Sequence, residues 1–270
     1  MGSHNKLATS LATNVGRVRT NNEDSLAEDR DLGLLVLADG MGGYNAGEVA
    51  SSIATSTIVE IVKRDWPTTG ADDAAIKALL NLAVHTAHDR IRSRAAADPD
   101  CAGMGTTAIA CLLNGSRMWI AHIGDSRLYR WREQSLSQLT QDHSLLEELV
   151  SRGHYSREDA SRLVRKNIVT RALGVEDEIS VDLLDQPLHA GDLLLLCSDG
   201  LTDMLDDTAI AAILDAPGSE LKALTQALIE AALTAGGRDN ISVALALVEQ
   251  LEGSGPVSWS ERLRKWWQAD

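Results

Sequence analysis

The segment LLVLADGMGG, residues 34–43, joins an unbroken apolar run to an Asp and three glycines. Leu34 to Ala38 predict a strand buried on both faces, and the glycines that follow favour a strand end over a helix. Asp39 then stands at a rigid strand end beside open backbone, which suits a cation or a phosphate. Turn chemistry alone also favours Asp there, so this segment by itself leaves both interpretations open.

The same construction occurs again in LLLLCSDGLTD, residues 193–203, a second apolar strand that ends in Asp-Gly. Two more acids stand at strand junctions, Asp125 in IGDSR and Asp239 in GGRDNIS. If one edge of a sheet core gathers these ends, they form a carboxylate cluster with Asp39 and Asp199. Such a cluster repels itself until a hard cation binds, and all-oxygen ligands favour Mg²⁺ or Mn²⁺ over Zn²⁺.

Composition limits the class of protein. A chain of 270 residues makes one large domain or two small ones, and 44% hydrophobic residues are enough for a sizeable core. Phe is absent, so that core must consist mainly of Leu, Ile, Val and Ala. The net charge of −14 argues against nucleic acid as a partner, because phosphate backbones are bound by Lys and Arg.

The cysteines and the first residues of the sequence indicate the cellular compartment. Three cysteines without CxxC spacing predict no disulfide framework and a reducing compartment. We expect no transmembrane helix and no signal peptide, and therefore a cytoplasmic protein. Residues 1–4, MGSH, are interpreted as the remnant of an expression tag.

Apolar periodicity predicts the secondary structure. Strands are expected over about 7–15, 26–31, 106–113, 117–123, 127–131, 179–184, 192–198 and 241–248. Helices are expected over about 46–63, 72–94, 206–214 and 218–235. Asn114-Gly115 is a hairpin signal. Residues 142–175 are expected to be helical and irregular, with a local surplus of basic residues.

Seven short motifs occur in series along residues 7–250. They are RTNNEDS (19–25), ADGMGG (38–43), GTTA (105–108), GDSR (124–127), LTQDHS (139–144), CSDGLTD (197–203) and GRDNIS (237–242). In this order they resemble the metal-dependent Ser/Thr protein phosphatases, the PPM or type 2C group, in their bacterial form. One such motif would be a weak signal, but seven in order are specific.

The resemblance implies an α+β fold: a central sandwich of two antiparallel β-sheets, flanked on both faces by pairs of antiparallel helices. The phosphatase domain would span residues 5–250, with a flap subdomain over about 143–178. Residues 251–270 would be a linker and an amphipathic, Trp-rich tail.

The resemblance also implies the metal ligands. Asp39 would bridge two tightly bound Mg²⁺ or Mn²⁺ ions, and the Gly40 carbonyl would bind one of them. Asp199 and Asp239 would complete this binuclear site. Asp125, together with Asp199, would serve a third and weaker cation.

Other roles carried by the resemblance surround the metals. Glu23 would reach a metal through water, with Asp24 and Asn240 supporting the ligands from behind. Arg19 would hold the substrate phosphate, which suits its planar fork, and the reaction would use a hydroxide bridging the two cations. Met41 stands where many eukaryotic relatives have His, and a thioether has no proton to give the leaving group.

The implied function is hydrolysis of phospho-Ser and phospho-Thr in phosphoproteins, reversing the action of a Ser/Thr kinase. We expect a monomer without nucleic acid. A cysteine phosphatase is the alternative enzyme, because Cys111 to Arg117 fit Cys-x5-Arg by spacing, although they read as a strand and its turn. A pseudophosphatase that binds phosphoproteins without turnover is the alternative from another class.

Two segments keep alternative interpretations. The basic flap is either a solvated helix face or a dock for acidic phosphoprotein through Arg162, Arg165 and Lys166. The tail, residues 257–270, either packs on the body or frays, or it docks a partner or a membrane surface.

Overall fold

The computed structural model describes residues 5–43, 46–69, 72–153, 155–164, 168–216 and 218–251. The predicted tag at 1–4 and the predicted tail at 257–270 lie outside these residues, so both stay predictions, as do the domain boundaries. Within the described ranges no helix is both long and apolar enough to span a bilayer.

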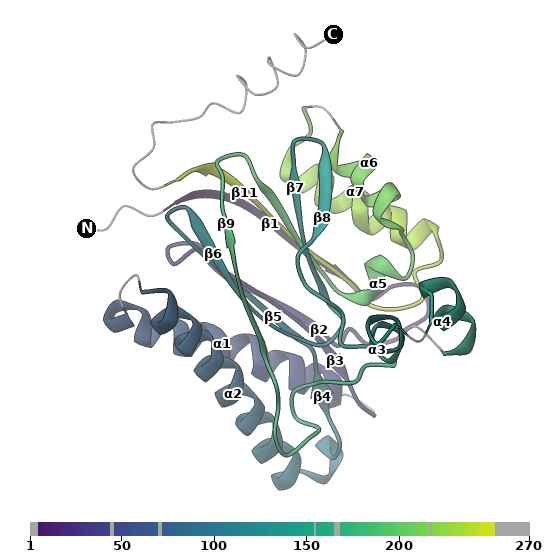
Figure 1. The fold of residues 1–270 in the computed structure, drawn as a ribbon. Coiled ribbons are helices and arrows are strands. Elements are labelled where there is room, and N and C mark those ends of the chain that lie inside the picture. The colour runs from purple at the N-terminus through teal and green to yellow at the C-terminus, as the bar shows by residue number, and fades with distance from the viewer. Residues whose placement is uncertain are drawn as a thin grey trace.

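Two antiparallel sheets form the centre of the molecule (Figure 1). The first, here called the β1 sheet, has the order β1 (Lys6–Asn14), β11 (Ile241–Gln250), β10 (Leu193–Cys197), β7 (Arg127–Arg132) and β8 (Ser135–Gln138). The second, the β3 sheet, has the order β2 (Asp24–Asp29), β3 (Leu34–Met41), β5 (Ala108–Asn114), β6 (Arg117–Ile123) and β9 (Asp182–Pro187). The short strand β4 (Gly105–Thr106) pairs with the end of β3.

The opening segment is a strand buried on both faces, as predicted. Alternate side chains of a strand point to opposite faces, and β3 supplies two separate cores in this way. Leu34 and Val36 join the core beneath the helices, whereas Leu35 and Leu37 join the core between the sheets. A central strand with two buried faces therefore carries Asp39 at its end.

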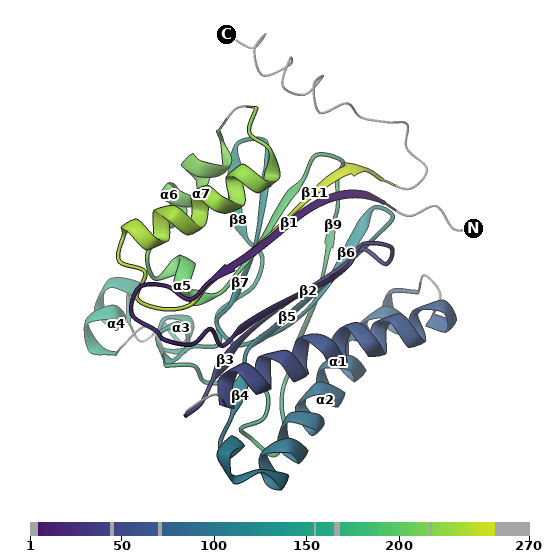
Figure 2. The same cartoon turned by 180° about the vertical axis from the view of Figure 1, so that it is seen from behind.

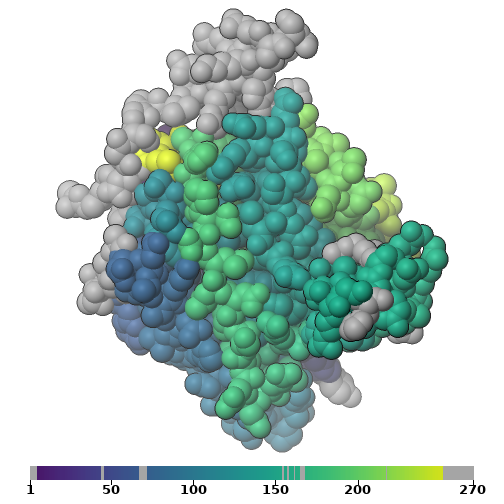
Figure 3. Space-filling view, in the orientation of Figure 1, coloured from purple at the N-terminus to yellow at the C-terminus, as the bar shows by residue number. Residues whose placement is uncertain are grey.

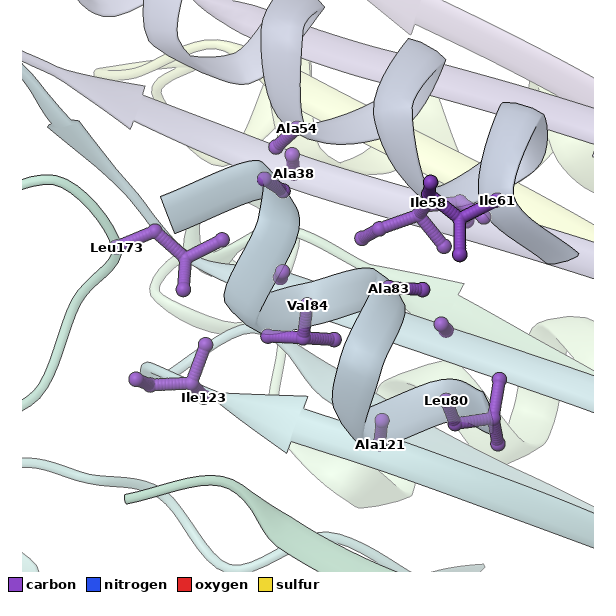
Figure 4. Packing of buried hydrophobic residues seen from close by; sticks show 14 of the residues in the cluster. Ala38, Ala54, Ile58, Ile61, Leu80, Ala83, Val84, Ala121, Ile123 and Leu173 are labelled. Atoms are coloured by element: carbon purple, nitrogen blue, oxygen red, sulfur yellow. The ribbon is translucent and has the colours of Figure 1, made fainter. Parts of the chain in front are cut away.

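Helices cover both outer faces, as Figure 2 shows from behind. The pair α1 (Ala46–Thr69) and α2 (Asp73–Ala97) packs on the β3 sheet through small and branched side chains such as Ala54, Ile58 and Val84 (Figure 4). On the β1 sheet lie α5 (Asp199–Thr202), α6 (Asp207–Leu214) and α7 (Leu221–Thr234). The predicted four-layer αββα arrangement is confirmed.

The flap lies between β8 and β9. It contains α3 (Leu145–Ser151) and α4 (Arg157–Leu163), which project from one side of the molecule (Figure 3). Each helix starts at a serine, Ser144 and Ser156, whose hydroxyl accepts a hydrogen bond from a first-turn backbone N–H. The short helices and irregular connections predicted for this segment are present.

Some elements differ from the prediction. The strand expected at 26–31 is β2 at Asp24–Asp29, because the buried Asp24 pairs with Asp39 although a polar residue suggests a turn. The strands β4 and β8 and the helix α5 are too short for periodicity to reveal. A 3₁₀ turn at Pro99–Cys101 was also not predicted. The Asn114-Gly115 hairpin is confirmed, with Gly115 at a φ of +54°.

Candidate metal centre

Four sequence-predicted acids stand at the ends of elements from both sheets. Asp39 lies near the end of β3, and Asp125 lies in the turn between β6 and β7. Asp199 opens α5 directly after β10, and Asp239 precedes β11. Three of them act electrostatically on the fourth: the charges of Asp125, Asp199 and Asp239 each raise the pKa of Asp39. The predicted gathering of these acids is therefore present.

Backbone segments pack closely around the acids on each sheet. A Cβ on Gly200 would lie 1.9 Å from the Asn240 carbonyl oxygen, so only glycine lets α5 approach the start of β11 so closely. A Cβ on Gly40 would lie 2.1 Å from the Gly47 carbonyl oxygen and 2.5 Å from that of Glu23. Glycine is thus required directly after both Asp39 and Asp199.

Hydrogen bonds hold Asp39 from behind. Its backbone N–H donates to the Thr107 hydroxyl at 2.9 Å, and its carbonyl accepts from the Thr106 hydroxyl at 2.9 Å. The Ser198 hydroxyl donates to Asp24 at 2.8 Å and so connects the two sheets. Sequence reasoning missed the roles of these hydroxyls, although the GTTA and CSDG motifs contain them.

Asn240 holds the loop that carries Arg19 and Glu23. Its amide donates to the carbonyls of Val15 and Asn21 at 3.0 and 2.8 Å, and its oxygen accepts from the Glu23 N–H at 2.8 Å. Arg19 is half-exposed and donates to Asp239 at 2.8 Å. The loop between β1 and β2 is thereby fixed over the edge of the acids.

The acids of this cluster face other acids more than they face basic side chains. Burial, followed by repulsion from Asp24 and Asp199, raises the pKa of Asp39 well above its ordinary value. Burial and the neighbouring acids do the same to the pKa of Asp199. Burial, with repulsion from Asp142, raises the pKa of Asp125 to about 6. A cation bound beside these carboxylates would favour their charged form and so lower the pKa values again.

The donor set fits a hard divalent cation. One oxygen of the buried Asp24 has no hydrogen-bond partner among the described residues. The oxygens available are carboxylates and backbone, which suit Mg²⁺ or Mn²⁺.

An open cavity of about 970 Å³ lies between the flap and the start of α5 and α6, and we call it the acidic groove. Asp125 and Asp199 line it, as do six further acids and the single base Arg127. Arg127 is itself paired with Asp142 at 2.7 Å. The groove that meets the acid cluster is therefore strongly negative.

The basic surplus of the flap is partly neutralised within the flap. Arg162 pairs with Glu158 at 2.6 Å, and Arg152 pairs with Glu148 at 3.4 Å, each one helical turn apart. Arg165 and Lys166 lie outside the described residues. Docking of acidic phosphoprotein by this segment stays a prediction.

The cysteine alternative is wrong for this chain. Cys111 is fully buried within β5, and burial raises the pKa of its thiol to about 12. A phosphate-cleaving thiol needs exposure and a lowered pKa. Asn114 and Gly115, inside the Cys-x5-Arg spacing, form the β5–β6 turn, so no phosphate-binding loop exists there.

Comparison with known proteins gives one consistent result. A sequence profile described as protein phosphatase 2C matches residues 16–245. The serine/threonine phosphatase Stp of Listeria welshimeri is 40% identical over 236 residues, covering 86% of this chain and 92% of the relative. A serine/threonine phosphatase structure from S. agalactiae is 36% identical with a TM-score of 0.82, covering 90% of this chain and 100% of that one.

A second solved structure contains metal. It is the catalytic domain of the serine/threonine phosphatase PstP in complex with two manganese ions. It is 38% identical to this chain with a TM-score of 0.78, covering 89% of this chain and 97% of that one.

Proposed function

Because the chain belongs to the protein phosphatase 2C family, we propose that its clustered carboxylates hold two tightly bound divalent cations. Family membership makes the chain a metal-dependent protein serine/threonine phosphatase that acts on phosphoproteins. The ligand residues, the number of cations and the choice between Mg²⁺ and Mn²⁺ belong to the proposal. The manganese-bound PstP structure supports it.

The proposed ligands of the two cations are Asp39, the Gly40 carbonyl, Asp199 and Asp239. The observation that carries this assignment is the meeting of the Asp39 end of β3 with the Asp199 start of α5, joined by the Ser198–Asp24 hydrogen bond, and the raised pKa values of Asp39 and Asp199 agree with it. Asp125, at the edge of the acidic groove, is the proposed ligand of a third, weaker cation.

The remaining site residues position these ligands and the substrate. Glu23 lies beside Asp24 at the start of β2 and is proposed to act through a water. Asn240 fixes its backbone. One Arg19 nitrogen contacts Asp239, and we propose that the other N–H groups of its fork bind phosphoryl oxygens.

When bound, the cations supply Lewis-acid chemistry, which activates water at neutral pH and neutralises phosphoryl charge. Arg19 adds positive charge on the phosphoryl group from the open side, where its side chain is half-exposed. The leaving-group proton cannot come from Met41, because a thioether carries none.

Metal stoichiometry tests the ligand assignment. Equilibrium titration of the metal-free protein with Mn²⁺ should give two tight sites and one weak site. Asp239→Asn should remove tight binding, Asp125→Ala should remove only the weak site, and the exposed control Asp100→Asn should change neither. Two tight sites in Asp239→Asn would refute the assignment.

Activity separates catalysis from phosphoprotein binding without turnover. Asp39→Asn should abolish phosphate release from a phosphopeptide, as should EDTA in the parent protein. Unchanged release in either case would contradict metal-dependent hydrolysis at this site.

The finer biology is also a proposal. We propose that the protein opposes a Ser/Thr kinase in the cytoplasm, supported by three cysteines that are all free and buried. Pulldown with phosphopeptides and fractionation of cells are the corresponding tests.

A further inference from the structure

Two histidines that the proposed chemistry does not use lie directly behind Asp125. His122 and His143 are both buried, and their ring centroids are 4.8 Å apart. One comes from β6, and the other from the segment that leads into the flap helix α3. A strand of the β3 sheet and the base of the flap therefore meet at this turn.

Each histidine binds a different side of the Asp125 turn. His143 Nδ1 accepts the Gly124 N–H at 3.0 Å, and the backbone N–H of His143 donates to the Gly124 carbonyl at 2.8 Å. His122 Nε2 donates to the Ser126 carbonyl at 3.1 Å. The pair thus holds backbone groups of both residues that flank Asp125, namely Gly124 and Ser126.

These contacts also assign the protons. Since Nδ1 of His143 accepts a backbone N–H, the proton of the neutral ring is on Nε2, which faces Asp182 at 3.2 Å. A protonated ring would direct two N–H groups at each other. Burial lowers the pKa of His143, and burial together with His143 lowers the pKa of His122 to about 4. Both rings are therefore neutral at pH 7.

The same residues resemble a transition-metal site, which the hydrogen bonds disfavour. His122, His143 and Asp182 form the one set of three metal-ligating side chains in the described residues whose ligand atoms all lie within 4.8 Å of one another. A metal would need the lone pair of His143 Nε2, where the proton is. Arg171 Nη1 also lies 3.4 Å from that nitrogen and adds positive charge.

We propose that His122 and His143 are positioning residues that clamp the Gly124–Ser126 turn and so aim the Asp125 carboxylate. The clamp is closed on its other side, because Ser126 shares a 2.8 Å hydroxyl hydrogen bond with Thr107, which also holds Asp39. Gly124 has a φ of +111°, and a Cβ there would lie 2.5 Å from the Thr107 side chain. The turn has no room to rotate without losing these bonds. The inference rests on the proposed role of Asp125 as the ligand of the weaker cation.

Paired substitutions test the clamp. His143→Asn keeps an acceptor for the Gly124 N–H, whereas His143→Leu removes it. His122→Gln keeps a donor for the Ser126 carbonyl, whereas His122→Leu removes it. The control is His189→Leu, at an exposed histidine between β9 and β10.

The readout is Mn²⁺ affinity at the weak site, measured by equilibrium titration with the two tight sites filled. Loss of supporting hydrogen bonds behind a ligand typically weakens metal binding about 10- to 100-fold. By the same rule, each Leu variant at the pair should lose at least about 10-fold, and the His143→Asn and His122→Gln variants should stay within about 3-fold of the parent. Tight binding should not change in any of them.

Several outcomes overturn the clamp. Parent affinity at the weak site in both Leu variants would do so, as would equal losses in each polar variant and its Leu partner. If His143→Leu does not fold, the His122 pair decides alone. Asp125→Ala distinguishes a wrong ligand assignment from a wrong clamp. If this variant keeps the weak site, Asp125 is not its ligand. If only Asp125→Ala removes the weak site, the clamp fails and the ligand stands.

Discussion

Protonation of His122 should make the folded protein less stable in mild acid. Its pKa is about 4 in the folded state and about 6.5 in an unfolded chain. The unfolded chain therefore binds the proton first as the pH falls. The stabilisation is complete above about pH 6.5 and is lost progressively as the pH falls toward 4.

The magnitude follows from these two values. Between pH 7.5 and pH 5.0 the contribution of His122 to the free energy of unfolding falls by about 2 kcal/mol, in favour of the unfolded chain. Solvent does not screen the charge that protonation would place on His122, because the side chain is fully buried. The groups that face it are His143, Asp142, Asp182 and the Ser126 carbonyl, and burial outweighs the two acids.

The assay is urea unfolding of the parent and His122→Gln at both pH values, with EDTA present throughout. Other titrating groups, including Asp125, contribute equally to both proteins and cancel in the difference. The parent should lose about 2 kcal/mol more than the variant on going to pH 5.0. Equal losses within about 0.5 kcal/mol would refute the assigned neutral, buried state of this ring.

Three further predictions concern the centre and its groove. Arg19→Ala should lower kcat/KM for a phosphopeptide about 10- to 100-fold by removing charge-assisted bonds to phosphate, and an unchanged value would exclude its contact with substrate. Gly200→Ala should cost about 2 kcal/mol or more in urea unfolding, because its Cβ would strike the Asn240 carbonyl. Gly43→Ala, with nothing within 4 Å of the added Cβ, is the matched control. Arg residues beside the phosphoresidue should lower KM relative to Glu residues at low salt, because the acidic groove is negative. The opposite preference would favour substrate docking on the basic flap.

The sequence alone predicts the parts of the site that follow local rules. Asp39 and Asp199 each follow an apolar run and precede a glycine, so the pattern predicts an acid at the end of each of two buried strands. The sequence predicts a turn at Asp24, because Asp is rare in strands. In the structure Asp24 is buried within β2 and pairs with Asp39 of β3. Only the tertiary structure reveals that partner.

The histidine pair shows a different limit. His122 occupies a buried strand and His143 a loop, and their contact depends on how the flap segment returns to the β6–β7 turn. No spacing rule connects two such residues. The assignment of protons needs still finer information, namely which ring nitrogen faces a backbone N–H.

The pairing of β1 with β11 joins nearly the first described residues to the last strand. During synthesis on the ribosome, β1 emerges early, and its partner β11 follows only after all the other described helices and strands. Asp239 and Asn240, which precede β11, arrive at the same late moment. Contacts this distant in sequence form slowly, so we expect the strand ends that carry the acids to come together late in folding. A chain that stops before residue 239 would keep most of the motifs but would lack β11, and β1 would then have no partner strand.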